Sequence, residues 1–165
     1  MYIHTATLED VPDIIQFFRD ELYPHLDRKR LAYDASIIEG SIRHSAHNDR
    51  YHIAQIGGST AGFIWTRKIR LPGMYKPSLV PIALLVSKKH IGTGTAMELL
   101  RHEDSYGRYN GLDTRQIISL MNRTKEPHYR GEGFVEFQTP EGGLAEAPRD
   151  RRRYWGPGRK NIGEP

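Results

Sequence analysis

Apolar residues recur at two spacings along the first half of the chain, and the change between them falls near residue 50. Val11, Ile14, Ile15 and Phe18 lie three or four positions apart, or next to each other, which is typical of a helix with one buried face. From Tyr51 onward apolar and polar residues alternate, which is typical of strands. In chain order the pattern predicts a strand at Tyr2–Ala6, helices at Leu8–Glu21 and Ala35–Ser45 with Thr7 and Asp34 as their N-caps, and hairpin strands at Tyr51–Gln55 and Thr60–Arg67.

The second half opens with the most continuous apolar run of the chain, Leu79–Val86, which predicts a strand buried on both faces. A glycine-containing loop follows, and Thr95–Tyr109 then has the pattern of a helix that ends at the next asparagine and glycine. Further predicted elements are a strand at Thr114–Met121, one or two helical turns at Glu126–Arg130 and a strand at Gly133–Phe137. The loop at Arg70–Pro77 is placed to form a wall of a substrate site, although most such loops are plain connectors.

The composition is that of an ordinary globular domain and excludes several classes of protein. The 165 residues include no cysteine, so disulfides and thiolate metal sites are excluded. No apolar run approaches the roughly 20 residues of a membrane span, and the N-terminus lacks the basic and apolar segments of a signal peptide. We therefore expect a cytoplasmic protein with no membrane partner.

The net charge of +4 is concentrated near the C-terminus, where residues 149–160 contain six basic residues and one acid. Proline and glycine are frequent after Gln138, so we predict one domain over residues 1–138 and an irregular basic tail over 139–165. Within the tail, Arg151–Trp155 interleaves arginine with aromatic residues. This pattern suits nucleic acid, an acidic partner protein or a merely solvated terminus.

The loop after the buried strand has the chemistry of an anion site. Gly92 and Gly94 bracket Thr93, and glycine allows the backbone to approach a ligand closely. Main-chain N–H groups followed by a helix N-terminus favour a phosphate or pyrophosphate, although the same residues also suit a tight turn. The loop is not a Walker loop, because Gly-Lys-Ser/Thr is absent, and Met97 replaces the third glycine of the dinucleotide fingerprint.

The glycine loop belongs to a wider set of residues, which comprises Val86 at the strand end, the loop Lys89-His90-Ile91-Gly92-Thr93-Gly94, then Asn122, Tyr129 and Gly133-Phe134. This set resembles the GCN5-related N-acetyltransferases (GNAT superfamily). Lys89 stands where the family usually has Arg or Gln, a departure that keeps a hydrogen-bond donor. The resemblance implies an α/β fold with a mixed, mostly antiparallel, six- to seven-stranded splayed sheet and helices on both faces.

The resemblance also implies acetyl-CoA as co-substrate, and it implies no metal. The main chain of Leu85 and Val86 would pair with the pantetheine arm, in a slot between this strand and a strand ending near Asn122. The backbone N–H groups of Ile91, Gly92, Thr93, Gly94 and Thr95, with Lys89 in the same motif, would hold the pyrophosphate. Asn122 would bind CoA or orient the adjacent segment, unless it is only a turn residue.

Catalysis, by the same resemblance, is direct attack of a primary amine on the thioester, with Tyr129 protonating the departing thiolate. The alternative for Tyr129 is a packing role in a helical turn. The apolar strand carries no carboxylate, so the general base stays open among Glu21, Asp34, His52 and a water chain. His44 and His47 have no acidic partner nearby in the sequence and are interpreted as surface histidines rather than metal ligands.

The sequence does not identify the acceptor, which is a small-molecule or a protein amine, and it leaves homodimer formation open. The rival function is a non-catalytic protein with a CoA-type fold. Such a protein would use its basic tail to engage nucleic acid or an acidic protein.

Overall fold

The computed structural model describes residues 1–25, 28–29, 31–46, 49–70, 72–124, 135–138, 144–146 and 153–155. The elements in chain order are β1 (Tyr2–Thr5), η1 (Leu8–Asp10), α1 (Val11–Glu21), η2 (Tyr23–His25), α2 (Leu31–Ser45), β2 (Arg50–Ile56), β3 (Ser59–Ile69), β4 (Ser78–Val86), η3 (Lys88–His90), α3 (Thr95–Tyr109), α4 (Arg115–Thr124), β5 (Val135–Gln138), β6 (Leu144–Glu146) and β7 (Arg153–Trp155). Among these residues no helix combines the length and apolarity that crossing a membrane requires. The predicted division at residue 138 stays a prediction, because most of 139–165 lies outside the described part.

The strands form one sheet in which each strand pairs antiparallel with the next strand of the chain. The long strands β3 and β4 occupy its centre, whereas β5, β6 and β7 are segments of four, three and three residues. The predicted six- to seven-stranded sheet is therefore reached only by counting these short segments. β4 and β5 are paired from Ala83 to Leu85, so the predicted splay is not seen over that stretch.

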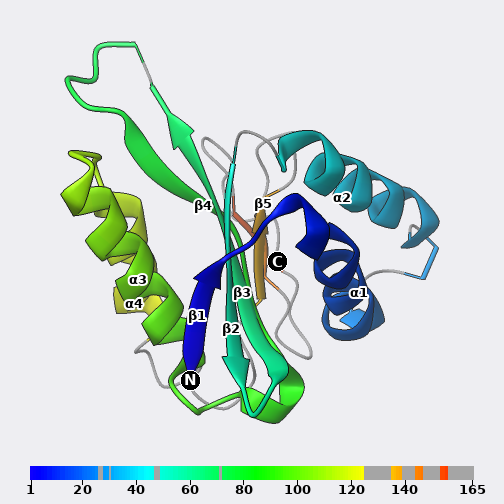
Figure 1. Ribbon diagram of the computed structural model, residues 1–165. Helices are drawn as coiled ribbons and strands as arrows, with labels where there is room; N and C mark the ends of the chain where they lie inside the picture. Colours follow the sequence, from blue (N-terminus) through cyan, green and yellow to red (C-terminus); the bar gives the residue numbers. More distant parts are fainter. Residues whose placement is uncertain are drawn as a thin grey trace.

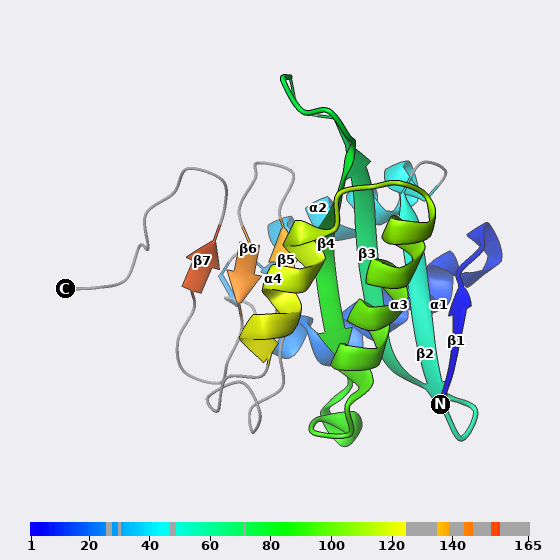
Figure 2. The same ribbon diagram turned by 90° about the vertical axis from the view of Figure 1, so that its left-hand side faces the viewer.

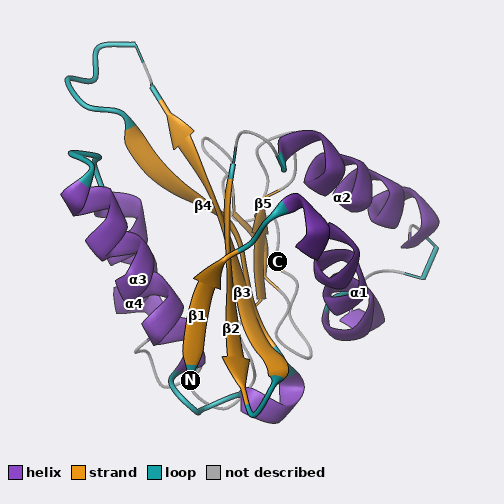
Figure 3. Ribbon diagram, viewed as in Figure 1, coloured by secondary structure: helices purple, strands orange, loops and turns teal. Residues whose placement is uncertain are grey.

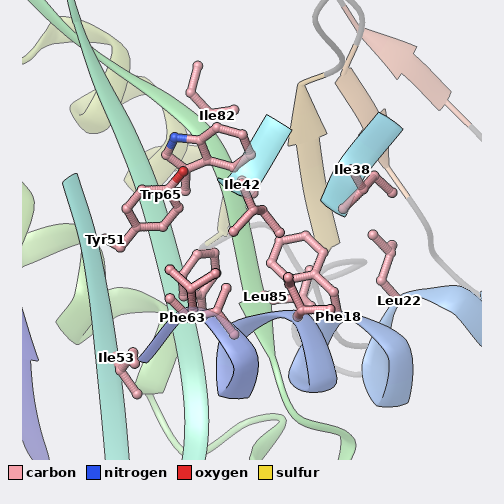
Figure 4. Packing of buried hydrophobic residues seen from close by; sticks show 14 residues of the cluster. Phe18, Leu22, Ile38, Ile42, Tyr51, Ile53, Phe63, Trp65, Ile82 and Leu85 are labelled. Atoms are coloured by element: carbon pink, nitrogen blue, oxygen red, sulfur yellow. The ribbon is translucent and has the colours of Figure 1, made fainter. Parts of the chain in front are cut away.

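Helices cover both faces of the sheet, which confirms the predicted α/β class (Figures 1 and 3). On one face, α1 and α2 pack against the sheet through a cluster rich in aromatic residues (Figure 4). The Phe18 ring meets Phe63 edge-on at 5.4 Å between centroids, and Tyr51 stacks on Trp65 at 5.2 Å. Such ring pairs add to the stabilisation that comes from burial of their apolar area.

On the other face, α3 and α4 lie over the sheet with an aliphatic core that includes Leu84, Leu99 and Ile117. Two glycines allow close approach at this interface. A Cβ added to Gly62 of β3 would lie 2.7 Å from Thr95 Cγ2, and one added to Gly107 of α3 would collide with the methyl group of Thr114.

One predicted element is wrong in type. Residues 114–121 were expected as a strand, but α4 is a helix from Arg115 to Thr124. Ile117 and Leu120, three positions apart, are both buried, which suits a helix, and a short apolar run does not separate the two types by itself. The Asp113 carboxylate accepts the Arg115 N–H at 3.0 Å and so caps the helix start.

A smaller correction concerns the second helix. α2 begins at Leu31, four residues before the predicted start, so Asp34 lies in its first turn rather than at the N-cap. An acid is favoured in either place, because both lie near the positive end of the helix dipole. The remaining strand and helix predictions that fall on described residues are confirmed in type, and α3 has the predicted bounds.

Candidate functional site

β4 ends beside the glycine loop, and its pairing changes along its length. Its register with β3 skips Ile82, because Trp65 pairs with Ala83 and Thr66 pairs with Pro81, which makes a β-bulge. Leu85 is paired on both sides, with Phe63 of β3 and Val135 of β5. Val86 pairs with Gly62 of β3. On the β5 side the register continues from Val135 to residue 134, which lies outside the described residues.

The turn that follows is held by its own hydrogen bonds. The buried Ser87 donates its N–H to the Ala61 carbonyl at 2.9 Å, and its hydroxyl lies 2.8 Å from His90 Nδ1. The Thr93 hydroxyl donates to the His90 carbonyl at 2.7 Å. These bonds shape a loop whose outer residues, Gly92 to Gly94, are exposed.

The two glycines are required by the backbone conformation of this loop. Gly92 has φ 78° and Gly94 has φ 84°, values in the left-handed region that other residues rarely adopt. A Cβ placed on either glycine meets no other atom within 4 Å, so the space in front of this backbone is open. The loop therefore offers a cradle for a ligand without side-chain obstruction.

The cradle leads directly into the N-terminus of α3. The first intrahelical bond runs from the Glu98 N–H to the Gly94 carbonyl at 3.0 Å, so the N–H groups of Thr95, Ala96 and Met97 precede it. Lys88 and Lys89, both exposed, lie immediately before the loop. Main-chain donors, the helix dipole and two ammonium groups together favour an anion at this end of the sheet.

A carboxylate from α1 reaches the same end of β4. Glu21 Oε2 accepts the Lys88 N–H at 2.8 Å, although 67 positions separate the two residues. Nothing in the sequence pattern predicted this contact, because it depends on how α1 crosses the sheet. The structure thus places Glu21, one of the candidates for general base, beside the loop.

A polar cluster on α1 and α2 holds this part of α1 in position. Arg19 Nε donates to Glu39 Oε1 at 2.9 Å, and the Tyr23 hydroxyl donates to the same oxygen at 3.0 Å. The hydrogen bond from Arg19 lowers the pKa of the Glu39 carboxyl, and burial raises the pKa of the Tyr23 phenol. Glu39 is thus ionised and Tyr23 is a neutral donor at neutral pH.

His52 is sequestered elsewhere. It is fully buried on β2, and its Nδ1 donates to the Glu103 carboxylate of α3. Its Nε2 lies 3.0 Å from the Thr5 hydroxyl and 3.0 Å from an Arg50 guanidinium nitrogen, which only donates, so Nε2 is an acceptor. Both ring nitrogens are occupied, which leaves His52 unsuited to act as a base.

The described residues include only part of the predicted site. It brings together the ends of β4 and α3 with the residues of the loop: Leu85, Val86, Lys89, Ile91, Gly92, Thr93, Gly94 and Thr95. Asn122 is exposed in the last turn of α4 rather than at a strand end, so the strand predicted to border the slot near Asn122 is wrong. Tyr129, Gly133 and Phe134, like His47, lie outside the described residues.

Comparisons with known proteins agree with this architecture. No protein-family model matches the sequence, and no curated protein matches it either. A GCN5-related N-acetyltransferase from Ralstonia eutropha JMP134 is similar in structure, with a TM-score of 0.59 and 13% identity over 76% of this chain and 91% of that one.

Two further solved structures are similar to a comparable extent. An aminoglycoside acetyltransferase from an uncultured soil metagenomic sample, in complex with sisomicin, has a TM-score of 0.53 and 13% identity over 76% of this chain and 87% of its own. A ribosomal-protein-alanine N-acetyltransferase from Brucella melitensis biovar Abortus 2308 has a TM-score of 0.51 and 15% identity over 69% of this chain and 76% of its own. The chain therefore has the fold of the GCN5-related N-acetyltransferases, which confirms at the level of fold the resemblance of its glycine loop.

Proposed function

We propose that this protein transfers an acetyl group from acetyl-CoA to a primary amine. The observation that carries the proposal is the unit of β4, glycine loop and α3 N-terminus, set in a fold shared with N-acetyltransferases. The unit offers main-chain donors, two lysines and open space, which together fit a pyrophosphate.

Residues of this chain would divide the work of binding the donor. The N–H groups from Ile91 to Thr95 receive the pyrophosphate, and Lys89 adds charge. For this the Thr93 N–H exchanges its 3.3 Å bond to the His90 carbonyl for one to the ligand. The main chain of Val86, at the end of β4, pairs with the pantetheine arm, as an added strand would. Leu85 is already paired with Val135, so pairing of the arm at Leu85 requires β5 to move away from β4 there.

The thioester supplies an activated acyl carbon, and the chain supplies proton transfer and charge stabilisation. A main-chain N–H near the bulge at Ile82 is the proposed donor to the developing oxyanion, because a bulge turns peptide groups out of the regular ladder. Tyr129 is the proposed general acid for the thiolate. Glu21, at the loop end of β4, is the proposed group that accepts a proton from the attacking ammonium, directly or through water.

The general acid is tested by the substitution Tyr129→Phe. We expect kcat to fall by about 10²–10⁴-fold with little change in the affinity for acetyl-CoA, because a positioned acid acts in the transition state. The measurement is release of free CoA thiol with a saturating amine. Tyr2→Phe, at a tyrosine that is 65% exposed on β1, serves as the control and should keep full activity. Unchanged turnover in Tyr129→Phe would remove this residue from the role.

The rival function is a non-catalytic protein that keeps the fold and engages nucleic acid or an acidic protein through its basic tail. Calorimetric titration with acetyl-CoA, followed by a screen of polyamines, amino acids, aminoglycosides and lysine peptides for thiol release, separates the two. Binding with turnover of one amine class supports the enzyme. Binding of acetyl-CoA without turnover of any amine supports the rival function. If acetyl-CoA does not bind at all, the proposal of a CoA site is wrong.

A further inference from the structure

The β3–β4 hairpin extends beyond the body of the domain at the end of the sheet opposite the glycine loop (Figures 1 and 2). We call residues 67–70 and 72–77 the hairpin arm. β4 begins at the arm with Ser78 and ends at the loop with Val86. Nine residues of strand correspond to about 25–30 Å, so the arm is remote from the proposed pyrophosphate site.

The arm is joined to the turn between α3 and α4. The Asp113 N–H donates to the Pro77 carbonyl at 2.9 Å, and the Leu79 N–H donates to the Asp113 carbonyl at 2.9 Å. Ser78 and Asp113 form a parallel bridge. Two segments that are distant in sequence therefore meet at this end of the sheet. We call their exposed basic and aromatic residues the end surface: Lys68, Arg70, Tyr75, Lys76 and Tyr109.

The end surface has cations without matching acids. Residues 67–77 contain four basic residues and no acidic one. Arg67 is occupied by Asp49, at 2.7 Å, but no ion pair is found for Lys68 or Arg70 among the described residues. The nearby carboxylate of Asp113 is hydrogen-bonded by Arg115 at 2.9 and 3.0 Å, and this hydrogen bonding lowers the pKa of the Asp113 carboxyl. The charge of Lys76 lowers the same pKa to a smaller extent, so Lys68 and Arg70 are the cations without an acidic neighbour among the described residues.

Two tyrosines on this surface are almost entirely in solvent. Tyr75 is 93% exposed and Tyr109 is 91% exposed, the highest values among the large apolar and aromatic residues of the described chain. The other exposed large apolar or aromatic residues of the described chain are Met1, Tyr2 and Leu8, and none of them lies in the arm. A typical protein-binding surface has a more apolar centre than this.

We propose that the end surface binds single-stranded nucleic acid. Lysine and arginine side chains would contact phosphates, and the two exposed tyrosine rings would stack on bases. Exposed aromatic rings and exposed cations at the same end of the sheet fit a flexible polyanion whose bases are free to stack. This function is separate from the proposed acetyl transfer, and the basic C-terminal tail is not required for it.

The proposal is tested with the full-length protein and fluorescein-labelled 20-mers of U and dT, by anisotropy across a salt series. Tyr75→Ala and Tyr109→Ala should each weaken binding by about 5–150-fold, the range expected for the loss of one stacked base. Lys68→Gln, Arg70→Gln and Lys76→Gln together should reduce the slope of log K against log salt by about 2, since each single-strand phosphate contact contributes about 0.7.

Three controls make the result decisive. Tyr2→Ala removes an exposed tyrosine elsewhere and should leave oligonucleotide binding unchanged, and thermal melts confirm that each variant is folded. Acetyl-CoA binding should be unchanged in all arm variants, which separates failure here from failure of the enzyme proposal. Loss of binding only in a variant with Arg151, Arg152 and Arg153 changed to Gln would assign binding to the tail and overturn the proposal. Binding of poly-glutamate but not of oligonucleotides, or no binding of either, would overturn it as well.

Discussion

At the residue scale, Gly94 links the chemistry of the site to its backbone, because its φ of 84° sets the entry into α3. Gly94→Ala should strain this conformation by about 1 kcal/mol and weaken acetyl-CoA binding by about tenfold or more. Calorimetric titration measures the affinity. The matched control is Gly111→Ala at the other end of α3, where φ is 67° and an added Cβ also meets nothing within 4 Å.

Both glycine variants should lose similar stability, but only Gly94→Ala should lose affinity for acetyl-CoA. Affinity for acetyl-CoA that is unchanged in both variants would contradict the assignment of the loop to the pyrophosphate. An equal loss of this affinity in both variants would indicate a general effect of weakening α3.

Glu103 is a second residue whose environment predicts a measurable effect, here on the free energy of unfolding. Its carboxylate is fully buried and accepts from His52 and from the Thr66 hydroxyl, with Arg50 Nε 4.0 Å away. Glu103→Ala would leave these donors unsatisfied in the interior. We expect the free energy of unfolding to fall by about 3–5 kcal/mol, as measured by urea denaturation.

The comparison for this prediction lies on the same helix. Glu98 pairs with Arg101 at the surface, so Glu98→Ala should change the free energy of unfolding by less than about 1 kcal/mol. Glu103→Gln, which keeps the shape and can accept from Thr66, should fall between the two. Similar values for Glu98→Ala and Glu103→Ala would show that the buried pair contributes nothing.

At the element scale, the contact between α3 and α4 depends on a helical glycine. Gly107 faces Thr114, and an added Cβ would collide with its methyl group, while the Thr114 hydroxyl is held by Asp104 at 2.6 Å. Gly107→Ala should therefore destabilise the protein by about 1–3 kcal/mol. Gly40→Ala in α2 has open space around the new methyl group and should instead stabilise by about 0.5–1 kcal/mol. Opposite signs in thermal or urea unfolding are the expected result, and a gain in both would refute the close packing.

The sequence predicted most elements correctly where local pattern and local chemistry agree. The strand, glycine loop and helix from Leu79 to Tyr109 were all predicted from residues within the segment itself. α4 was missed because Ile117, Ile118, Leu120 and Met121 suit either periodicity, and the cap at Asp113 was not weighed as a helix start. The contact of Glu21 with Lys88 was beyond prediction as a specific bond, since a relation across 67 residues arises only when the fold is complete.

At the scale of the whole molecule, two unlike cores share one sheet. The aromatic core under α1 and α2 and the aliphatic core under α3 and α4 meet through β3 and β4, whose side chains enter both. The sequence supports a prediction for the donor half of the proposed reaction, because that half would use the backbone of one local unit. It supports no prediction for the acceptor, because the acceptor depends on segments whose residues carry no pattern.

The bulge at Ile82 changes the pleat phase of β4, the order in which successive side chains turn to one face or the other. Ile82 and Ala83 are neighbours in sequence, yet both belong to the aromatic core, and Leu79 and Leu84, an odd number of positions apart, both belong to the aliphatic core. β4 thus consists of two regularly alternating segments joined by one extra residue. Deleting Ile82 would remove the bulge and leave one regular alternation in which each remaining side chain of β4 keeps its present face. Deleting Leu84 instead would turn the residues after it to the opposite face. A deletion scan along β4 should therefore find deletion of Ile82 less damaging than deletion of Leu84.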